Sequence, residues 1–418
     1  MTLTKAPIYL LSNLINALIP FLLLPILTRV LTPAEYGIIA MFTVSIGIFN
    51  AFTGLSLHGA VNVRYFDLSK EEMKNYISTC VLLLIISTLL VLLVVISSNS
   101  WLPTVLGIPN DWLIVAVIIS GFQFIANIRL ALWQVTGKAW SYGGFQISRT
   151  LLDALLSLVL ILGVSMAWQG RLLAQSIAFL TFGGIALYWL YKEDFFKLPE
   201  RFRLYSRDAL SFGIPLIPHT IGGLLVITTD RIIIANILGN DSVGIYMVAF
   251  QVSQVLGLIA DSFNKAYAPW LYKQLSKTDK SNHPFIIKGT YAYFLIIMIL
   301  AIIFGFTAPY LVQFMAGNEF WLSGTLVIYI AIGFAFGGCY YMVVNYLFFA
   351  KKTKNLAITT FMTGIINIPL TYFLVMKYGL EGAAIAFLII KLLNFIIIWP
   401  LSNKLYPMPW LGVFKKRN

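Results

Sequence analysis

The chain carries very little charge for its length. Aspartate, glutamate, lysine and arginine make up 11% of its 418 residues, whereas soluble proteins contain about 25%. So few charges cannot cover a water-exposed surface, and hydrophobic residues reach 59% of the chain. The composition therefore excludes a string of soluble domains and indicates a protein whose main solvent is lipid.

Motifs that support catalysis or metal binding are also scarce. The two cysteines, Cys80 and Cys339, lie in separate apolar runs and predict neither a disulfide framework nor a metal site. The three histidines lack metal-like spacing with acids, and there is no glycine-rich phosphate loop or nucleophile motif. We therefore expect no metal, no cofactor and no enzymatic activity.

Twelve apolar stretches are long enough to cross a bilayer as helices, which takes about 20 residues each. They centre near Ile19, Ile46, Leu89, Ile119, Leu156, Leu180, Ile221, Gln254, Ile297, Phe334, Ile366 and Ile390. With a cytoplasmic N-terminus, 22 of the 29 lysines and arginines fall on the cytoplasmic side. The net charge of +13 then reflects the positive-inside rule and contact with membrane lipids, not nucleic-acid binding. Both termini are expected to be cytoplasmic.

The two halves of the chain resemble each other. Gly37 pairs with Gly244 at an offset of 207 residues, and Gly170 pairs with Gly382 at an offset of 212. Six spans per half give both halves the same orientation in the membrane. The sequence thus predicts an all-α polytopic membrane protein of about 12 transmembrane helices in two six-helix lobes. The expected parts are an N-lobe over 1–198, a cytoplasmic linker over 199–207 and a C-lobe over 208–418.

Prolines and polar stripes interrupt the apolar spans. Pro20 and Pro25 in the first span, with Pro215 and Pro218 in the seventh, predict kinked or broken leading helices in both halves. Polar residues recur at helical spacing in four spans: Asn50 and His58 in the second, Gln123 and Asn127 in the fourth, Gln251, Gln254, Asp261 and Lys265 in the eighth, and Asn367 in the eleventh. Such stripes either bond neighbouring helices or line a polar cavity. Matched stripes in both halves favour a shared cavity.

Ionisable residues inside the spans are costly and therefore informative. Arg149 and Asp153 lie four residues apart, so they share a helix face and can pair. The dipeptide Asp230-Arg231 closes the seventh span, and Arg29 is its counterpart in the first half. Both arginines, like Arg129 at the inner end of the fourth span, have the alternative of snorkelling to the interface. Lys391 lies mid-span without a nearby acid and needs a partner, water or an anionic ligand.

Three segments together resemble the Wzx-type flippases of O-antigen and other polysaccharide repeat units, a branch of the multidrug/oligosaccharidyl-lipid/polysaccharide exporter superfamily. They are Tyr9–Arg29 with Thr32–Gly37, Thr229–Arg231 with Val243–Tyr246, and Tyr378–Ala386. The resemblance implies a V-shaped transporter with a central cavity that works by alternating access in the bacterial cytoplasmic (inner) membrane. It implies a substrate of undecaprenyl-pyrophosphate-linked oligosaccharide, moved from the inner to the outer leaflet for lipopolysaccharide or similar polysaccharide biosynthesis. The polysaccharide polymerase machinery is an implied partner.

A pyrophosphate headgroup is bound best by arginine and lysine through charge-assisted hydrogen bonds. We expect Arg149 and Lys265 to receive it from inside, Lys391 to assist midway, and Arg29 and Arg231 to lie toward the exit. The polar stripes would contact the sugars, and Asp153, Asp230 and Asp261 are candidates for ion coupling.

Two alternatives remain open. A MATE-like cation or drug antiporter would need an acid-dominated cavity. A polytopic glycan-assembly enzyme, such as a polymerase or acyltransferase, would depend on a few clustered polar residues.

Overall fold

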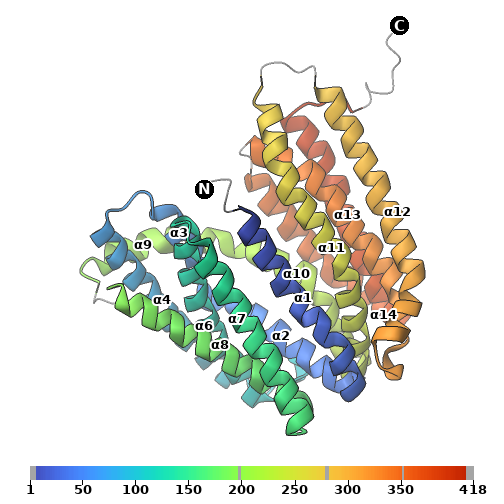
Figure 1. The fold of residues 1–418 in the computed structure, drawn as a ribbon, viewed down its shortest axis with the longest axis horizontal. Helices are drawn as coiled ribbons and strands as arrows, with labels where there is room; N and C mark the ends of the chain where they lie inside the picture. The colour runs from blue at the N-terminus through green and yellow to red at the C-terminus, as the bar shows by residue number, and fades with distance from the viewer. Residues whose placement is uncertain (1–5, 196–198, 278–281, 351–352, 411–418) are drawn as a thin grey trace. The chain divides into compact units, whose positions relative to one another are not determined.

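The structure is a computed structural model that describes residues 6–195, 199–277, 282–350 and 353–410, and within these ranges it contains helices and no strands. The first half comprises α1 Ala6–Val30, α2 Pro33–Gly54, α3 Leu57–Arg64, α4 Lys70–Ser97, α5 Leu102–Leu106, α6 Asn110–Val135, α7 Ala139–Leu158 and α8 Ala167–Lys192 (Figure 1). A π-helical turn, Val159–Gly163, extends α7. The second half comprises α9 Phe202–Gly213, α10 Ile217–Leu238, α11 Asn240–Leu275, α12 His283–Met315, α13 Ser323–Phe349 and α14 Thr353–Leu405. Short 3-10 turns cover Ile214–Leu216 and Asn318–Phe320.

All twelve predicted spans are present. Eleven helices in the described part of the chain are long and apolar enough to cross a membrane, and the last of them, α14, contains two spans. Gly379 breaks α14 with a φ of 60°. Thr363 donates a hydrogen bond of 3.0 Å to Asn394, although these residues would lie about 46 Å apart on a straight helix. The chain therefore reverses at Gly379, and the spans around Ile366 and Ile390 are separate helices.

Local sequence sets several helix boundaries. Thr32 caps α2: its hydroxyl accepts from the Glu35 amide, and the Glu35 carboxylate accepts from the Thr32 amide at 2.9 Å. Pro33 follows at the first helical position, where its missing N–H is not needed. The proline prediction holds for the second half, where the 3-10 turn with Pro215 separates α9 from α10. In the first half α1 continues through Pro20 and Pro25 as one helix.

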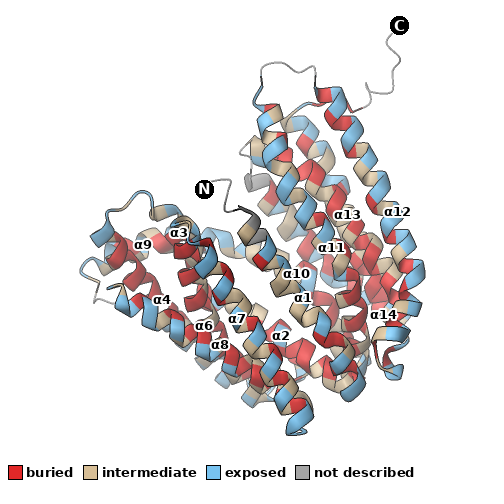
Figure 2. Cartoon of the chain, viewed as in Figure 1, coloured by how far each residue is buried: buried red, intermediate tan, exposed pale blue. Residues whose placement is uncertain are grey.

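The chain divides into two compact units, one of residues 1–224 with 239–244 and one of residues 225–238 with 245–418. Residues 208–224, expected in the C-lobe, lie in the first unit, and residues 196–198, at the end of the expected N-lobe, are outside the described residues. The predicted lobe boundaries stay a prediction. In both units the buried residues lie on the helix faces that meet other helices (Figure 2).

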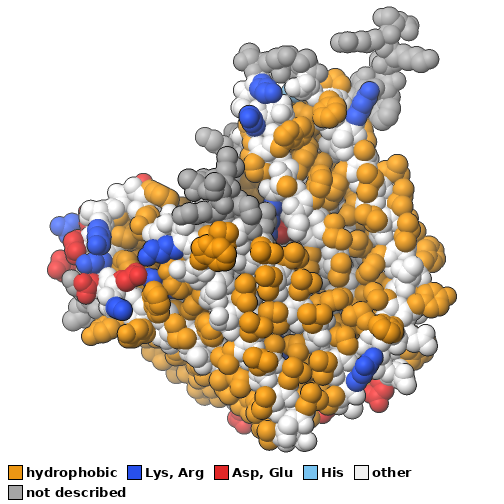
Figure 3. Space-filling view, viewed as in Figure 1, with side chains coloured by type: hydrophobic (Ala, Val, Ile, Leu, Met, Phe, Trp, Pro, Cys, Tyr) orange, Lys and Arg blue, Asp and Glu red, His pale blue; other side chains and the backbone are white. Residues whose placement is uncertain are grey.

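The surface is apolar along the helices. Leu93, Phe306 and Phe314 are each more than 60% exposed, and hydrophobic side chains cover much of the visible face (Figure 3). Soluble proteins rarely expose so large a contiguous apolar surface. The charged side chains of the first unit gather at the end that carries α3 and α9 (Figure 3).

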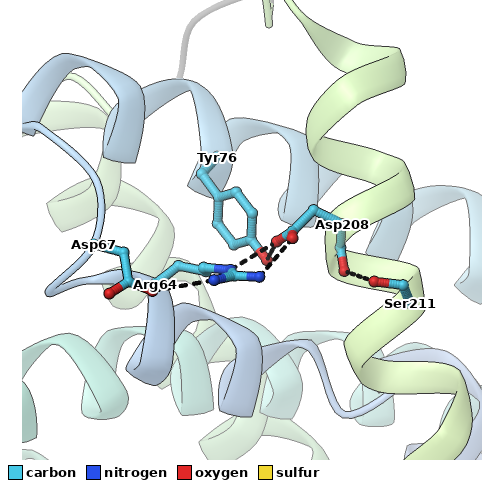
Figure 4. Close-up of polar contacts among 5 residues, drawn as sticks. All are labelled: Arg64, Asp67, Tyr76, Asp208 and Ser211. Carbon is cyan, nitrogen blue, oxygen red and sulfur yellow. Dashed lines mark hydrogen bonds and ion pairs between the residues drawn. The ribbon is translucent and has the colours of Figure 1, made fainter.

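The charged segment expected to act as a linker contributes the first half of the amphipathic helix α9, which belongs to the first unit. Asp208 of α9 accepts two hydrogen bonds from Arg64 of α3, at 3.0 and 2.7 Å, and one from the Tyr76 hydroxyl of α4, at 3.0 Å (Figure 4). The hydrogen bonds to Asp208 and then to Asp67 raise the pKa of Arg64 above its ordinary value. Tyr205 and Ala209 form the buried face of α9. This ion-paired cluster fixes α9 to α3 and α4.

Candidate functional site

The first unit contains a polar seam between α7 and α8. On α7, Tyr142, Gln146, Arg149, Asp153 and Ser157 follow one another at steps of three or four residues and so share a face. Of the two possible partners of Asp153, the structure shows Arg171 of α8 rather than Arg149 in the ion pair. Arg171 also donates to the Ser157 hydroxyl at 2.7 Å. The negative charge of Asp153 is thus balanced by an arginine of the facing helix.

Arg149 therefore has no acid in ion-pair contact, although the charge of Asp153, one turn away, still acts on it. Its guanidinium lies 4.9 Å from the centre of the Phe179 ring of α8, and the residue is half-buried. Within the described residues it makes neither an ion pair nor a hydrogen bond. A cation–π contact stabilises such a group by about 0.5–2 kcal/mol, far less than a buried charge requires. The site therefore favours an anion.

Two glutamines of the same seam were not singled out by the sequence. Gln146 donates to the Tyr142 hydroxyl at 3.2 Å, but its carbonyl oxygen is buried and has no partner in the part of the chain that the structure describes. The carbonyl oxygen of Gln175, one turn before Phe179 on α8, is also buried and without a partner there. The four-residue spacing of Arg171, Gln175 and Phe179 could have revealed Gln175 from the sequence, as the spacing of Tyr142, Gln146 and Arg149 could have revealed Gln146.

The polar stripe of the second span mostly bonds helices together. Asn50 of α2 donates to Gln123 of α6 at 3.2 Å, and Thr53 and Ser120 are 3.1 Å apart. A Cβ atom on Gly54 would lie 2.1 Å from the Phe124 ring, so the stripe allows α2 and α6 to pack closely. Asn127, one turn from Gln123, is half-buried and makes no hydrogen bond within the described residues.

His58 does not continue α2, because Leu55 and Ser56 adopt left-handed backbone angles and α3 begins at Leu57. Its ring lies edge-on to Phe124 at 5.3 Å, and its buried Nδ1 has no partner among the described residues. Burial lowers the pKa of His58. This histidine is therefore held as a neutral ring.

Snorkelling was the wrong expectation for Arg129. Its side chain is 1% exposed and forms a two-point ion pair with Glu193, at 2.5 and 2.7 Å, at the end of α8. The guanidinium also lies 4.6 Å from the Trp133 ring centre. Arg29, in contrast, is exposed at the end of α1.

The second unit contains a buried cationic cluster of Asp230, Arg231, Tyr246, Phe250, Phe387 and Lys391. Asp230 lies 3.2 Å from the Arg231 guanidinium and accepts from the Tyr246 hydroxyl at 2.5 Å. Arg231 is 3% exposed, so it does not snorkel, and it donates to the Met247 sulfur at 2.8 Å.

Aromatic rings connect Arg231 to Lys391 in this cluster. Arg231 lies 4.2 Å from the Phe250 ring centre, Phe250 meets Phe387 edge-on at 5.5 Å, and Lys391 lies 5.2 Å from the Phe387 ring centre. The Asp230 charge acts on Lys391, but no carboxylate lies within ion-pair distance of its ammonium among the described residues. Two cations thus share one carboxylate, and the cluster carries one uncompensated positive charge.

The remaining predicted site residues of the second unit divide into paired and exposed groups. Lys265 and Asp261 form an ion pair of 2.5 Å along α11, with side chains 42% and 38% exposed. Gln254 is exposed and Gln251 is half-buried. Asn367 is buried and structural, since it donates to the Leu225 carbonyl at 2.9 Å and accepts from Thr371 at 3.0 Å.

Twelve spans, an all-helical architecture and cations inside the spans define a polytopic transporter. The solved structure of the lipid II flippase MurJ in an inward closed conformation has the same fold, with a TM-score of 0.76 at 13% identity over 96% of this chain and 88% of that one. The family described as polysaccharide biosynthesis protein matches residues 3–275, and the chain belongs to this family.

Two relatives are similar over most of their length. "Lsg locus putative protein 1" of Haemophilus influenzae is 26% identical over 368 residues, which cover 86% of this chain and 88% of the relative. A "probable low-salt glycan biosynthesis flippase" of Haloferax volcanii is 21% identical over 90% of this chain and 78% of the relative.

Proposed function

We propose that the protein is a flippase for undecaprenyl-pyrophosphate-linked oligosaccharides, such as repeat units of O-antigen or a similar surface polysaccharide. It moves them by alternating access from the inner to the outer leaflet of a bacterial cytoplasmic membrane. The observation that carries the proposal is the excess of positive charge inside the spans: half-buried Arg149 forms no ion pair in one unit, and Arg231 and Lys391 have a single carboxylate, Asp230, beside them in the other. A pyrophosphate supplies the missing negative charge through charge-assisted hydrogen bonds.

The other predicted residues take roles that fit their surroundings. Lys265, exposed beside Asp261, meets the headgroup near the predicted cytoplasmic side, and Arg29 lies near the predicted outer side. Asn127, His58 and Gln254 contact sugars, whereas Asn50, Gln123 and Asn367 already bond within the fold. A polymerase that uses the exported units is the expected partner.

A cation antiporter is supported less well. Its mechanism needs carboxylates free to exchange a cation, and each candidate acid has a positive neighbour: Asp153 pairs with Arg171, Asp230 with Arg231, and Asp261 with Lys265. The excess of positive charge at the buried sites favours an anionic substrate instead.

Deletion in the native host, followed by complementation, tests this proposal. Cells without the protein should accumulate lipid-linked glycan on the inner leaflet, and Arg149→Gln or Lys391→Met should restore export at least about ten-fold less well than wild type, because each loses a charge-assisted bond. Lys377→Gln, which neutralises an exposed lysine, is the matched control and should export normally. Lipid-linked glycan on the outer surface of the deletion strain would contradict the proposal.

A further inference from the structure

The two unsatisfied glutamine oxygens lie in the same helix seam as Arg149. Gln146 precedes Arg149 by one turn on α7, and Gln175 precedes Phe179, the ring under Arg149, by one turn on α8. Because α7 and α8 run antiparallel, with Asp153 opposite Arg171 and Phe145 opposite Phe182, the two glutamines lie on opposite sides of the Arg149–Phe179 contact along the seam.

A buried acceptor without a donor costs about 1–3 kcal/mol, and the seam contains two. Elsewhere in the seam the polar atoms are matched, since Asp153 and Ser157 both bond to Arg171. The two unsatisfied oxygens therefore lie on either side of Arg149, which forms no ion pair within the described residues. Both acceptors are enclosed in this conformation, so a ligand reaches them when the seam side chains rearrange around it.

The missing groups specify the ligand chemistry. Arg149 needs an anion, and each glutamine oxygen needs a hydroxyl or amide donor within one helical turn, about 5.4 Å, of that anion. A phosphate ester alone supplies the anion but no donors. A sugar attached to a phosphate supplies both, because its hydroxyls lie next to the charge. The Phe179 ring provides an apolar surface for the sugar ring.

We propose that the α7–α8 seam binds the first sugar and its phosphate, with Arg149 on the phosphate and Gln146 and Gln175 on the sugar hydroxyls. The proposal rests on the proposed function and assigns its sugar selectivity to two residues. In contrast, Asn50 and Gln123 are hydrogen-bonded to each other, so they could bind a sugar only by breaking this bond between α2 and α6.

Binding measurements on the full-length protein in nanodiscs test the assignment. The two probes are undecaprenyl pyrophosphate and the undecaprenyl-pyrophosphate-linked glycan purified from the deletion strain. Gln146→Met and Gln175→Met keep the side-chain volume but remove the acceptor. Each should weaken binding of the glycan-bearing lipid about ten-fold and leave the affinity for undecaprenyl pyrophosphate unchanged, whereas Arg149→Gln should weaken both.

Ser148→Ala, on the exposed face of α7, is the matched control, and unchanged unfolding temperatures show that the variants are folded. Glutamine variants that bind the glycan-bearing lipid like wild type, or that lose both probes equally while folded, overturn the assignment. Should a methionine variant unfold, Gln146→Glu and Gln175→Glu replace it; their carboxylates still accept from a sugar but repel the phosphate, so glycan-bearing lipid should retain more affinity than the bare lipid. The proposed function fails separately, if wild type binds neither probe or the deletion strain accumulates no glycan-bearing lipid.

Discussion

Two glycines that sequence comparison pairs across the halves are neighbours in the structure. A Cβ atom on Gly37 of α2 would lie 2.0 Å from the Asn240 carbonyl oxygen, and one on Gly244 of α11 would lie 2.0 Å from the Pro33 carbonyl oxygen. An offset of 207 converts Pro33 to Asn240 and Gly37 to Gly244. The same contact therefore occurs twice with exchanged roles, as expected of duplicated segments that meet at a local two-fold axis.

Alanine at either glycine should be strongly destabilising. Gly37→Ala or Gly244→Ala places a methyl group against a backbone oxygen that cannot rotate away, at a cost of about 3 kcal/mol or more, so the unfolding temperature in detergent should fall. Gly184→Ala on α8 is the control, because nothing lies within 4 Å of its added Cβ atom. Equal stability of the Gly37 and Gly184 variants would contradict the close backbone contact between the start of α2 and the start of α11.

At the scale of the helix, α6 and α8 are joined by the ion pair between Arg129 and Glu193. The residues are 64 positions apart, and Arg129 is fully buried between Trp133 and Trp189. The hydrogen bonds from Arg129 are the largest cause that lowers the pKa of Glu193 below its ordinary value. A carboxylate with a lowered pKa stabilises the fold above its ordinary pKa, and this stability is lost as pH falls through the lowered value.

Glu193→Gln should therefore lower the unfolding temperature at neutral pH. Breaking a fully buried ion pair costs about 3–5 kcal/mol, and the partial exposure of Glu193, 36%, reduces the expected loss. Thermal unfolding measured against pH should show the difference between wild type and variant shrinking in acid, as pH falls through the lowered pKa of Glu193. As a control, Asp67→Asn at an exposed ion pair should change stability little. A difference that persists unchanged at acid pH would contradict the role of this ion pair.

Sequence predicts the elements of this protein better than its contacts. Long apolar runs predict all twelve spans, including the two on either side of Gly379 in α14, because lipid forces every span to be helical. The partner of Asp153 could not be predicted, since Arg171 belongs to the next helix and Arg149 is equally well placed on the same one. Similarly, Arg129 and Arg231 are near span ends, where snorkelling is usual, and only tertiary contacts show that Glu193 and Asp230 hold them inside.

At the scale of the whole molecule, charge decides how transport would be driven. The proposed substrate carries net negative charge, and the predicted topology moves it outward, the direction that an inside-negative potential favours for an anion. Each negative charge that crosses gains about 2.3 kcal/mol per 100 mV. The candidate coupling acids, Asp153, Asp230 and Asp261, are each next to a cation that already balances them. The membrane potential alone is then sufficient as a driving force.

Flipping in proteoliposomes should therefore follow the membrane potential without a sodium or proton gradient. With the predicted cytoplasmic face inside, a potassium diffusion potential that is negative inside should accelerate outward movement of glycan-linked undecaprenyl pyrophosphate, and the reversed potential should slow it. Replacement of sodium by choline at fixed potential is the control and should leave the rate unchanged, because each of the three candidate acids is already paired with a cation. A rate that ignores the potential but requires sodium or a pH gradient would show instead that one of the three ion pairs opens during the cycle, and Asp230, the most deeply buried of the three acids, would be the first to replace by asparagine.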